Sequence, residues 1–319
     1  MLKKRYLILI LLFISFSSWS QQKNHAFKII PLGVKGGDDE SNLSSYMLAP
    51  YGSNHFICLD AGTINAGIQK AIDRKTLKGI SEDIQRKQIK GYLISHAHLD
   101  HVAGLIINSP ADTAKNIYGI PSVLQILRDK YFTWDAWANF GNEGEKPQLK
   151  KYTYTNLEEG IFYPLTNTEM KVRAFELSHG KPYKSTAFLI QAKDNYVLYL
   201  GDTGADEIEK SDKLSRLWQE VAPLISSGKL KAILLEVSFP NEQPENQLFG
   251  HLTPQLFFNE LAKLQQLTTP EAMKKVSLIV THRKPPLKNM LKIKQQLVMQ
   301  NKPGFNFIFP EQGRLLIIN

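Results

Sequence analysis

The sequence is poor in cysteine and, after its first residues, in long hydrophobic runs. Cys58 is the one cysteine of the 319 residues, which excludes an intramolecular disulfide. Its position in the apolar run 56–59 indicates a small buried hydrophobic side chain. The chain also has no internal repeat, no low-complexity tract and no interdomain linker. Because 43% of its residues are hydrophobic, it can bury a substantial core, and one domain over 21–319 is expected.

The N-terminus has the pattern of a secretory signal peptide. Residues 3–5 are basic, and 6–16 is an apolar stretch too short to span a bilayer comfortably. Cleavage is predicted after Ser20, so that 1–20 is removed and the mature chain is periplasmic or secreted, with no stable membrane insertion. A membrane-anchoring helix is the alternative, which the polar residues after Ser20 disfavour.

Basic residues are in small excess over acidic residues. The formal net charge is +9, from 39 basic and 30 acidic residues, and removal of the three basic residues in 3–5 lowers it to +6. This excess favours anionic small molecules through long-range attraction, whereas the scattered basic residues argue against nucleic acid as the partner. The sequence leaves a homodimer open.

Short aliphatic and β-branched runs alternate with amphipathic segments of helical length, which predicts an α/β (α+β) domain with sheet at its centre. The predicted strands are 28–32, 45–48, 55–59, 91–94, 171–176, 185–191, 196–200, 232–235, 277–280 and 305–309. The predicted helices are 64–73, 102–107, 214–226, 253–264 and 286–300.

The segment 108–155 has the least regular pattern and carries Tyr131, Trp134, Trp137 and Phe140 among polar and glycine residues. The favoured interpretation is a peripheral helical insertion that buries its own aromatic side chains. A lid, a dimer contact or a direct role in substrate binding are the alternatives.

The strongest chemical signal follows the predicted strand 91–94. His96, His98, Asp100 and His101 crowd into six positions of the loop that leaves this strand, and an apolar helical segment comes next. Such a loop can turn imidazoles and a carboxylate toward one cavity, where nitrogen and oxygen ligands suit zinc-like ions. The sequence therefore predicts a metal site here.

Six positions cannot complete two coordination shells, so further ligands are expected at the ends of other strands. His179 follows the strand 171–176, Asp202 follows 196–200, and His282 follows 277–280. Each of these residues alone is as consistent with a turn or core residue as with a ligand. Together with the loop they complete a pattern.

These residues resemble the metallo-β-lactamase superfamily, whose mark is an H-x-H-x-D-H loop with later single His, Asp and His ligands. The resemblance covers most of the mature chain and implies a four-layered αβ/βα sandwich that binds two divalent metal ions at one edge. Zinc is the expected metal, with iron and manganese as alternatives. By this likeness the first metal is held by His96, His98 and His179, the second by Asp100, His101 and His282, and Asp202 bridges them.

A narrower resemblance is to the class II cyclic-nucleotide phosphodiesterases. It is carried by the stretches 36–46, 59–63, 236–241, 248–254 and 281–285, which occur in the expected order and spacing. Arg283 departs from the pattern, since an aliphatic residue is expected there. The family implies hydrolysis of a 3',5'-cyclic nucleotide, with cyclic AMP expected, to the 5'-monophosphate.

The chemistry implied by this resemblance assigns roles to further residues. A hydroxide that bridges two metals about 3.5 to 4 Å apart would attack phosphorus, and the departing alkoxide needs a proton. His251 is the expected general acid or phosphate contact, although its place before the helix start at Thr253 also allows a structural role. Glu236 is expected to orient His251. Asp60, at the end of the strand 55–59, is expected either to accept a hydrogen bond from a ligand histidine or to cap the turn before Gly62.

Two other functions remain open at this point. One is a different hydrolase of the same superfamily, such as a lactonase or another phosphodiesterase. The other is an exported protein that binds cyclic nucleotides without turnover, which the intact ligand set disfavours.

Overall fold

The computed structural model describes residues 25–319. The predicted signal peptide 1–20 and the cleavage after Ser20 therefore lie outside the described residues. Among the helices of the described part, none is long and apolar enough to cross a membrane.

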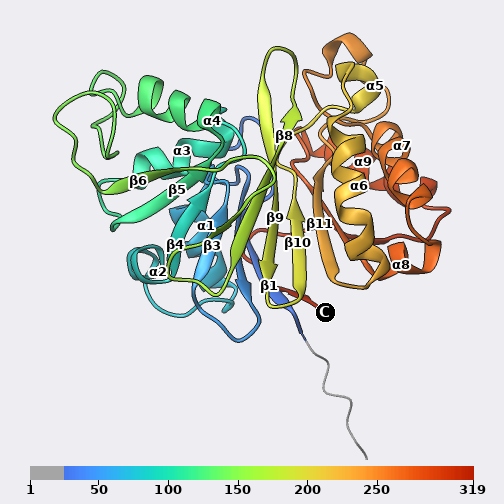
Figure 1. Ribbon diagram of the computed structural model, residues 1–319, viewed down its shortest axis with the longest axis horizontal. Coiled ribbons are helices and arrows are strands. Elements are labelled where there is room, and N and C mark those ends of the chain that lie inside the picture. The colour runs from blue at the N-terminus through green and yellow to red at the C-terminus, as the bar shows by residue number, and fades with distance from the viewer. Residues whose placement is uncertain (1–24) are drawn as a thin grey trace, which may run out of the picture.

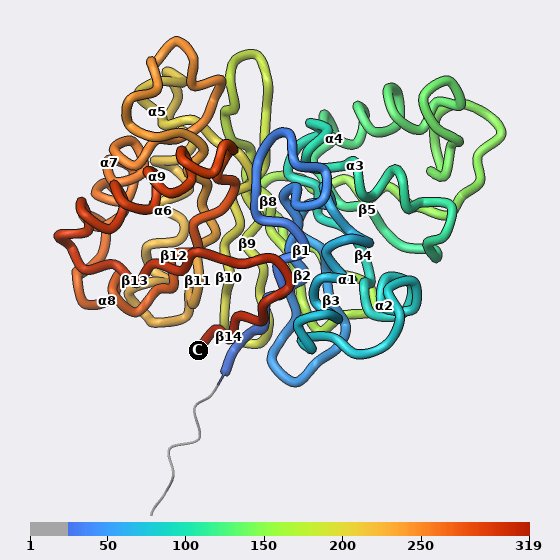
Figure 2. The backbone as a smooth tube through the Cα atoms, turned by 180° about the vertical axis from the view of Figure 1, so that it is seen from behind, coloured from blue at the N-terminus to red at the C-terminus, as the bar shows by residue number. Residues whose placement is uncertain are grey.

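The N-terminal half forms a seven-stranded sheet with the order β14-β1-β2-β3-β4-β5-β6. Its strands are β1 (Phe27–Gly33), β2 (Ser45–Pro50), β3 (Phe56–Leu59), β4 (Ile89–Leu93), β5 (Lys115–Gly119), β6 (Tyr152–Asn156) and β14 (Leu316–Ile318). The pairs from β14 to β3 are antiparallel and those from β3 to β6 are parallel. β14 comes from the far end of the chain, and Figure 2 shows it beside β1.

The second half forms another seven-stranded sheet, with the order β13-β12-β11-β10-β9-β8-β7. Its strands are β7 (Phe162–Pro164), β8 (Lys171–Ser178), β9 (Lys184–Ala192), β10 (Asn195–Tyr199), β11 (Leu230–Glu236), β12 (Ser277–Thr281) and β13 (Asn306–Ile308). The pairs from β7 to β10 are antiparallel and those from β10 to β13 are parallel.

The two sheets face each other and helices cover their outer faces, which gives four layers (Figure 1). The first sheet carries α1 (Asn65–Asp73), α2 (Ser81–Lys87), α3 (Leu99–Asn108) and α4 (Pro121–Ile126), which continues as a π-helical turn (Leu127–Tyr131). The second carries α5 (Asp206–Glu209), α6 (Lys213–Ser226), α7 (Pro254–Gln266), α8 (Pro270–Lys275) and α9 (Leu287–Gln300), with a 3-10 turn at Glu245–Gln247.

Apolar residues of both sheets pack into one core between them, which includes Phe27, Tyr46, Phe188 and Leu234. The opposite face of the second sheet packs on its helices through residues such as Trp218 of α6. The strands β4, β11 and β12 are almost entirely buried, which explains their continuous apolar runs. A rigid frame thus holds the loops that leave β4, β10, β11 and β12.

The segment 108–155, interpreted from the sequence as a helical insertion, has a more mixed structure. It supplies β5 and β6 to the edge of the first sheet, and its other residues, 108–114 and 120–151, lie outside the sheet. After the short helix α4 and its π-helical turn, 132–151 has no further helix. Phe132 and Phe140 are buried in the core and Trp137 is partly buried against it, whereas Trp134 is 40% exposed, so the segment buries only some of its aromatic side chains.

Candidate active site

The metal-binding loop predicted from the sequence connects β4 to α3. His98 has extended backbone angles and precedes the first residue of α3, so the chain turns sharply between His96 and His101. Both of these imidazoles are buried. The turn brings the side chains of the loop toward the end of the second sheet, where the other predicted ligands lie.

The residues predicted to hold the first metal lie together. His98 Nδ1 is 3.1 Å from His96 Nε2 and 3.2 Å from His179 Nε2. These nitrogens converge although they come from opposite sheets, since His96 follows β4 and His179 follows β8. A cation can be bound by all three nitrogens at once.

The residues predicted to hold the second metal form another group. His282 Nε2 lies 3.1 Å from Asp100 Oδ2, and His101 Nε2 lies 3.8 Å from the same oxygen. The backbone N–H of Gly37 donates to Asp100 Oδ2 at 2.9 Å and helps to orient this carboxylate. Two histidines and a carboxylate again make a donor set suited to a divalent cation.

Asp202 lies between the two groups. Its Oδ2 is 3.7 Å from His96 Nε2 and 3.9 Å from His179 Nε2, on the side of the first group. The same oxygen is 3.2 Å from His101 Nε2 and 3.1 Å from His282 Nε2, on the side of the second. Asp202 Oδ2 is therefore within 4 Å of nitrogens from both predicted ligand groups.

The second ring nitrogens of His101 and His179 have fixed partners. His101 Nδ1 donates to Asp60 at 2.7 Å, and His179 Nδ1 donates to the carbonyl oxygen of Gly250 at 2.8 Å. Because each acceptor holds the proton on Nδ1, Nε2 is left with the lone pair that a metal needs. The hydrogen bond predicted between Asp60 and a histidine of the loop is confirmed, and Ser95 and Tyr199 also donate to this carboxylate.

Two buried polar atoms at the centre of the site lack a hydrogen-bond partner among residues 25–319. They are His101 Nε2 and Asp202 Oδ1. Buried polar atoms are rarely left without a partner, because the loss of water is costly. Divalent cations at this position would satisfy both atoms, so the residues present fit the metal ions that the sequence predicts.

The electrostatic environment agrees with cation binding. Burial lowers the pKa of His96 well below its ordinary value, and burial with the adjacent His179 lowers the pKa of His98 to about 4, so both rings are neutral at neutral pH. Burial acts to raise the pKa of Asp202, but His101 and His282 hold it well below its ordinary value. Burial lowers the pKa of His101, yet Asp202, with the other nearby carboxylates, raises it well above its ordinary value. An entering cation would displace that proton.

His251 and Glu236 form a buried pair beside the predicted metal ligands. His251 Nδ1 is 2.7 Å from Glu236 Oε1 and 3.8 Å from Asp202 Oδ2. Burial lowers the pKa of His251 and, together with the charge of Asp202, raises the pKa of Glu236. Within the described residues the hydrogen bonds of His251 are made by Nδ1, which leaves Nε2 for a substrate.

Ser238 connects this pair to the predicted metal ligand His282. No role for Ser238 was predicted from the sequence. Its hydroxyl donates to Glu236 Oε2 at 2.6 Å and lies 2.9 Å from His282 Nδ1, from which it can accept. One hydroxyl thereby orients the carboxylate behind His251 and the ring of His282. Its sequence signal was its place two residues after Glu236 in a family motif.

Gly36 is a further residue whose role depends on the fold. A Cβ at this position would lie 2.1 Å from His282 Cε1, so only glycine lets the chain pass this ring. His282 itself has a positive φ of 56°, an uncommon conformation for a histidine. Next to it, Arg283 stacks its guanidinium over the ring of Phe309 at 5.4 Å, where the family pattern expects an aliphatic side chain.

Together, the facing sheets and the histidine-rich edge define a metal-dependent hydrolase of the metallo-β-lactamase fold. Solved structures share this fold across nearly the whole chain. Unliganded yeast PDE1 aligns with a TM-score of 0.80 at 22% identity and covers 92% of this chain and all of that one. The metallo-β-lactamase fold protein YhfI of Bacillus subtilis aligns with a TM-score of 0.59 at 14% identity, over 91% of this chain and 99% of that one.

The sequence comparisons identify the family within this fold. The family model of the class-II cAMP phosphodiesterases matches residues 81–313. A 3',5'-cyclic-nucleotide phosphodiesterase of Aliivibrio fischeri is 41% identical over 94% of this chain and 95% of its own length. A probable 3',5'-cyclic-nucleotide phosphodiesterase of Yersinia pestis is 34% identical over 94% and 92%, respectively. The chain belongs to the class-II cyclic-nucleotide phosphodiesterases.

Proposed function

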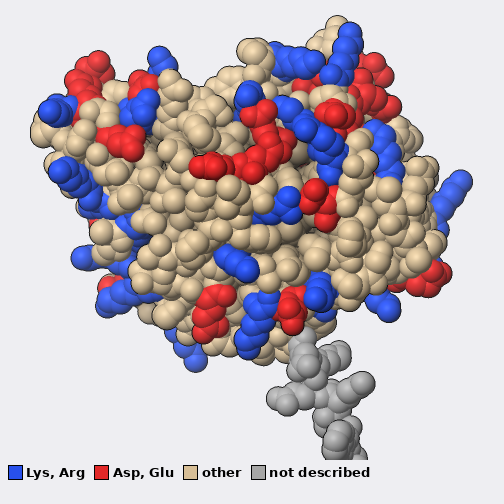
Figure 3. Space-filling view, viewed as in Figure 1, with Lys and Arg blue, Asp and Glu red and all other residues tan. Residues whose placement is uncertain are grey.

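We propose that this protein is an exported enzyme that hydrolyses 3',5'-cyclic AMP to 5'-AMP at a site for two divalent cations, with Zn²⁺ as the expected metal. The observation that carries the proposal is Asp202 Oδ2, which lies within 4 Å of nitrogens from both histidine groups. The family and its named relatives support the substrate class. Figure 3 shows basic and acidic side chains interspersed over one face, a surface consistent with a small-molecule substrate.

The metal ligands and their supporting residues have separate tasks. When bound, two divalent cations neutralise the phosphate charge and make hydroxide available at neutral pH. The protein residues fix the donors that such cations need: Asp60 and the Gly250 carbonyl orient His101 and His179, and Ser238 orients His282. The donor atoms are thus held in place before the substrate arrives.

His251 supplies the proton for the leaving group in this proposal. Attack of water oxygen on phosphorus breaks the bond to the 3'-oxygen, which leaves as an alkoxide and needs a proton. His251 Nε2 donates that proton. Glu236, whose pKa burial raises, supplies a proton to Nδ1 through the 2.7 Å hydrogen bond, so the imidazole stays neutral after the transfer. The product keeps its phosphate on the 5'-oxygen.

The substrate is tested with purified, metal-loaded protein and three compounds: cyclic AMP, an acyl-homoserine lactone and bis(4-nitrophenyl) phosphate. We expect turnover of cyclic AMP to 5'-AMP, identified by chromatography against 3'-AMP. Lactone turnover without cyclic AMP hydrolysis would overturn the proposal.

His251→Ala is expected to lower kcat for cyclic AMP by about 100-fold, because general acid catalysis contributes about 100-fold or more. Turnover of bis(4-nitrophenyl) phosphate should change much less, since 4-nitrophenolate leaves without protonation. The measurement is steady-state kinetics on both substrates, with the exposed His55 replaced by alanine as the control. Equal losses on the two substrates would contradict a proton-donor role.

Export is proposed from the N-terminal pattern alone. The full chain, expressed in a Gram-negative host, is expected in the periplasmic fraction with its N-terminus at Gln21. Fractionation and N-terminal sequencing measure this, and a chain that lacks residues 2–20 is the control. Recovery of the uncleaved chain in the cytoplasm would disprove export.

A further inference from the structure

A largely apolar cavity of about 660 Å³ opens beside the second group of predicted ligands. Asp100 belongs to both the ligand group and the cavity wall. Gly37, which donates its N–H to Asp100, also lines the cavity. A substrate bound through its phosphate at the metal site can therefore extend into this space.

The helix α3 presents apolar side chains to this cavity. Leu99 and Ile107 line it and are 61% and 66% exposed, respectively, although both are large aliphatic residues. Exposed apolar surface next to a charged site is typical of a ligand-binding pocket, because the ligand covers it when bound.

Two aromatic side chains from the segment between β5 and β6 complete the wall, and both are held in place by hydrogen bonds. The hydroxyl of Tyr131 donates to the carbonyl oxygen of Ala97 at 2.9 Å. The indole N–H of Trp137 donates to Ser109 Oγ at 3.0 Å, and Ser109 is fully buried. Rings that are fixed before binding lose little conformational entropy when a planar group packs on them.

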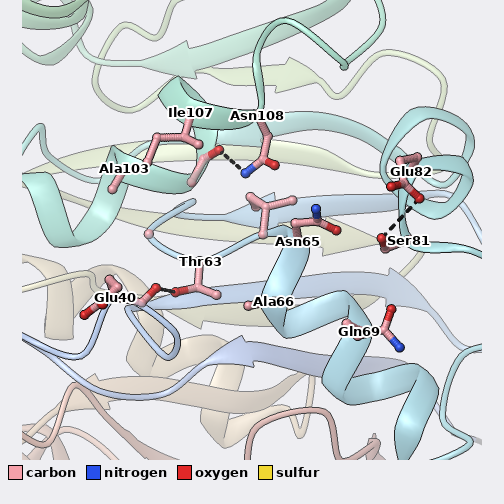
Figure 4. Close-up of a pocket in the computed structure, with 13 residues that line it drawn as sticks. Glu40, Thr63, Asn65, Ala66, Gln69, Ser81, Glu82, Ala103, Ile107 and Asn108 are labelled. Atoms are coloured by element: carbon pink, nitrogen blue, oxygen red, sulfur yellow. Dashed lines mark hydrogen bonds between the residues drawn. The ribbon is translucent and has the colours of Figure 1, made fainter.

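Two neighbouring cavities lack this combination. The pocket in Figure 4 lies between α1 and α3 and shares Glu40, Ala103 and Ile107 with the cavity. None of the predicted ligands lines it, and polar side chains such as Asn65 and Gln69 face it. A smaller cavity of about 310 Å³ is lined by Tyr183, whose ring packs on His98 of the first group. It is less than half the size of the cavity beside Asp100.

We infer that the cavity beside Asp100 binds the purine base of the cyclic nucleotide and that the rings of Trp137 and Tyr131 pack against this base. The carboxylates of Asp38 and Glu40 line the same cavity and can accept hydrogen bonds from a purine amino group. The inference rests on the proposed function, since it assigns this cavity to the base of a substrate whose phosphate is held at the metal site.

The test is Trp137→Ala in the metal-loaded enzyme, assayed on cyclic AMP and on bis(4-nitrophenyl) phosphate, which has no base. Stacking of a base on an aromatic ring is worth enough that KM for cyclic AMP should rise about tenfold. Turnover of the base-free substrate should stay near the wild-type value. Trp134→Ala is the matched control, because Trp134 comes from the same segment and is absent from the cavity wall.

Two outcomes would overturn the assignment. The first is an unchanged KM for cyclic AMP in Trp137→Ala, and the second is a KM that rises in Tyr183→Ala but not in Trp137→Ala. If Trp137→Ala fails to fold, Ile107→Glu replaces it, because this exposed position tolerates a charge that disfavours the base. If the wild-type protein cleaves the base-free substrate but not cyclic AMP, the proposed function is wrong, and so is the assignment of the base pocket.

Discussion

Replacing Asp202 with alanine is expected to lower kcat/KM for cyclic AMP by at least about 1,000-fold, because a metal site contributes several kcal/mol to the transition state. The carboxylate is buried, and its Oδ2 contacts nitrogens of both histidine groups. Its loss leaves imidazoles of the two groups facing each other without the charge between them. Steady-state kinetics with excess Zn²⁺ measure the effect.

The matched control is Asp194→Ala, which removes an exposed carboxylate from the turn between β9 and β10. This variant should keep wild-type activity. Circular dichroism shows whether the Asp202 variant folds, so a loss of activity can be assigned to the site. Unchanged hydrolysis of cyclic AMP by Asp202→Ala would mean that the two-metal mechanism is wrong.

Removal of the metal ions is expected to abolish activity and to lower Tm by about 10 °C. Ions whose free concentration is far above their Kd stabilise the folded state by several kcal/mol, and this stabilisation is lost when they are removed. The ligands come from both sheets, so bound ions would connect the two halves of the molecule. Without them, His101 Nε2 and Asp202 Oδ1 stay buried without a partner.

Elemental analysis of the purified protein should find two metal equivalents per chain, one for each of the two predicted ligand groups, both of which are among the residue groups that could hold a metal ion. Dialysis against a chelator, followed by calorimetry and activity assays, gives the change, and added Zn²⁺ should restore both properties. A single bound ion at full activity, or a Tm that the chelator does not affect, would contradict the proposal.

The central part of the fold was predictable from the sequence because its strands are buried on both faces. Such strands appear as continuous apolar runs, as in 91–94 and 277–280, which the structure has as β4 and β12. β5 and β6 were missed because the polar and aromatic residues of 115–119 and 152–156 give no such run. The three-residue strand β14 is too short to produce a pattern.

The candidate site was predictable where its residues lie close together in the sequence or directly after a predicted strand. The loop from His96 to His101 is a local motif, and His179, Asp202 and His282 each follow a predicted strand. Ser238 and Gly36 could not be found in the same way, because their roles depend on contacts with His282 across the fold. The base pocket was beyond reach for the same reason, since its walls come from segments that the sequence does not place side by side.

The pairing of β14 with β1 affects when the protein can fold. Phe27 pairs with Ile318, so the first sheet gains its outermost strand only after the last residues have been synthesised. Until then β1 has one unpaired edge, which is a surface prone to aggregation. A chain that lacks residues 316–318 would therefore expose this edge permanently.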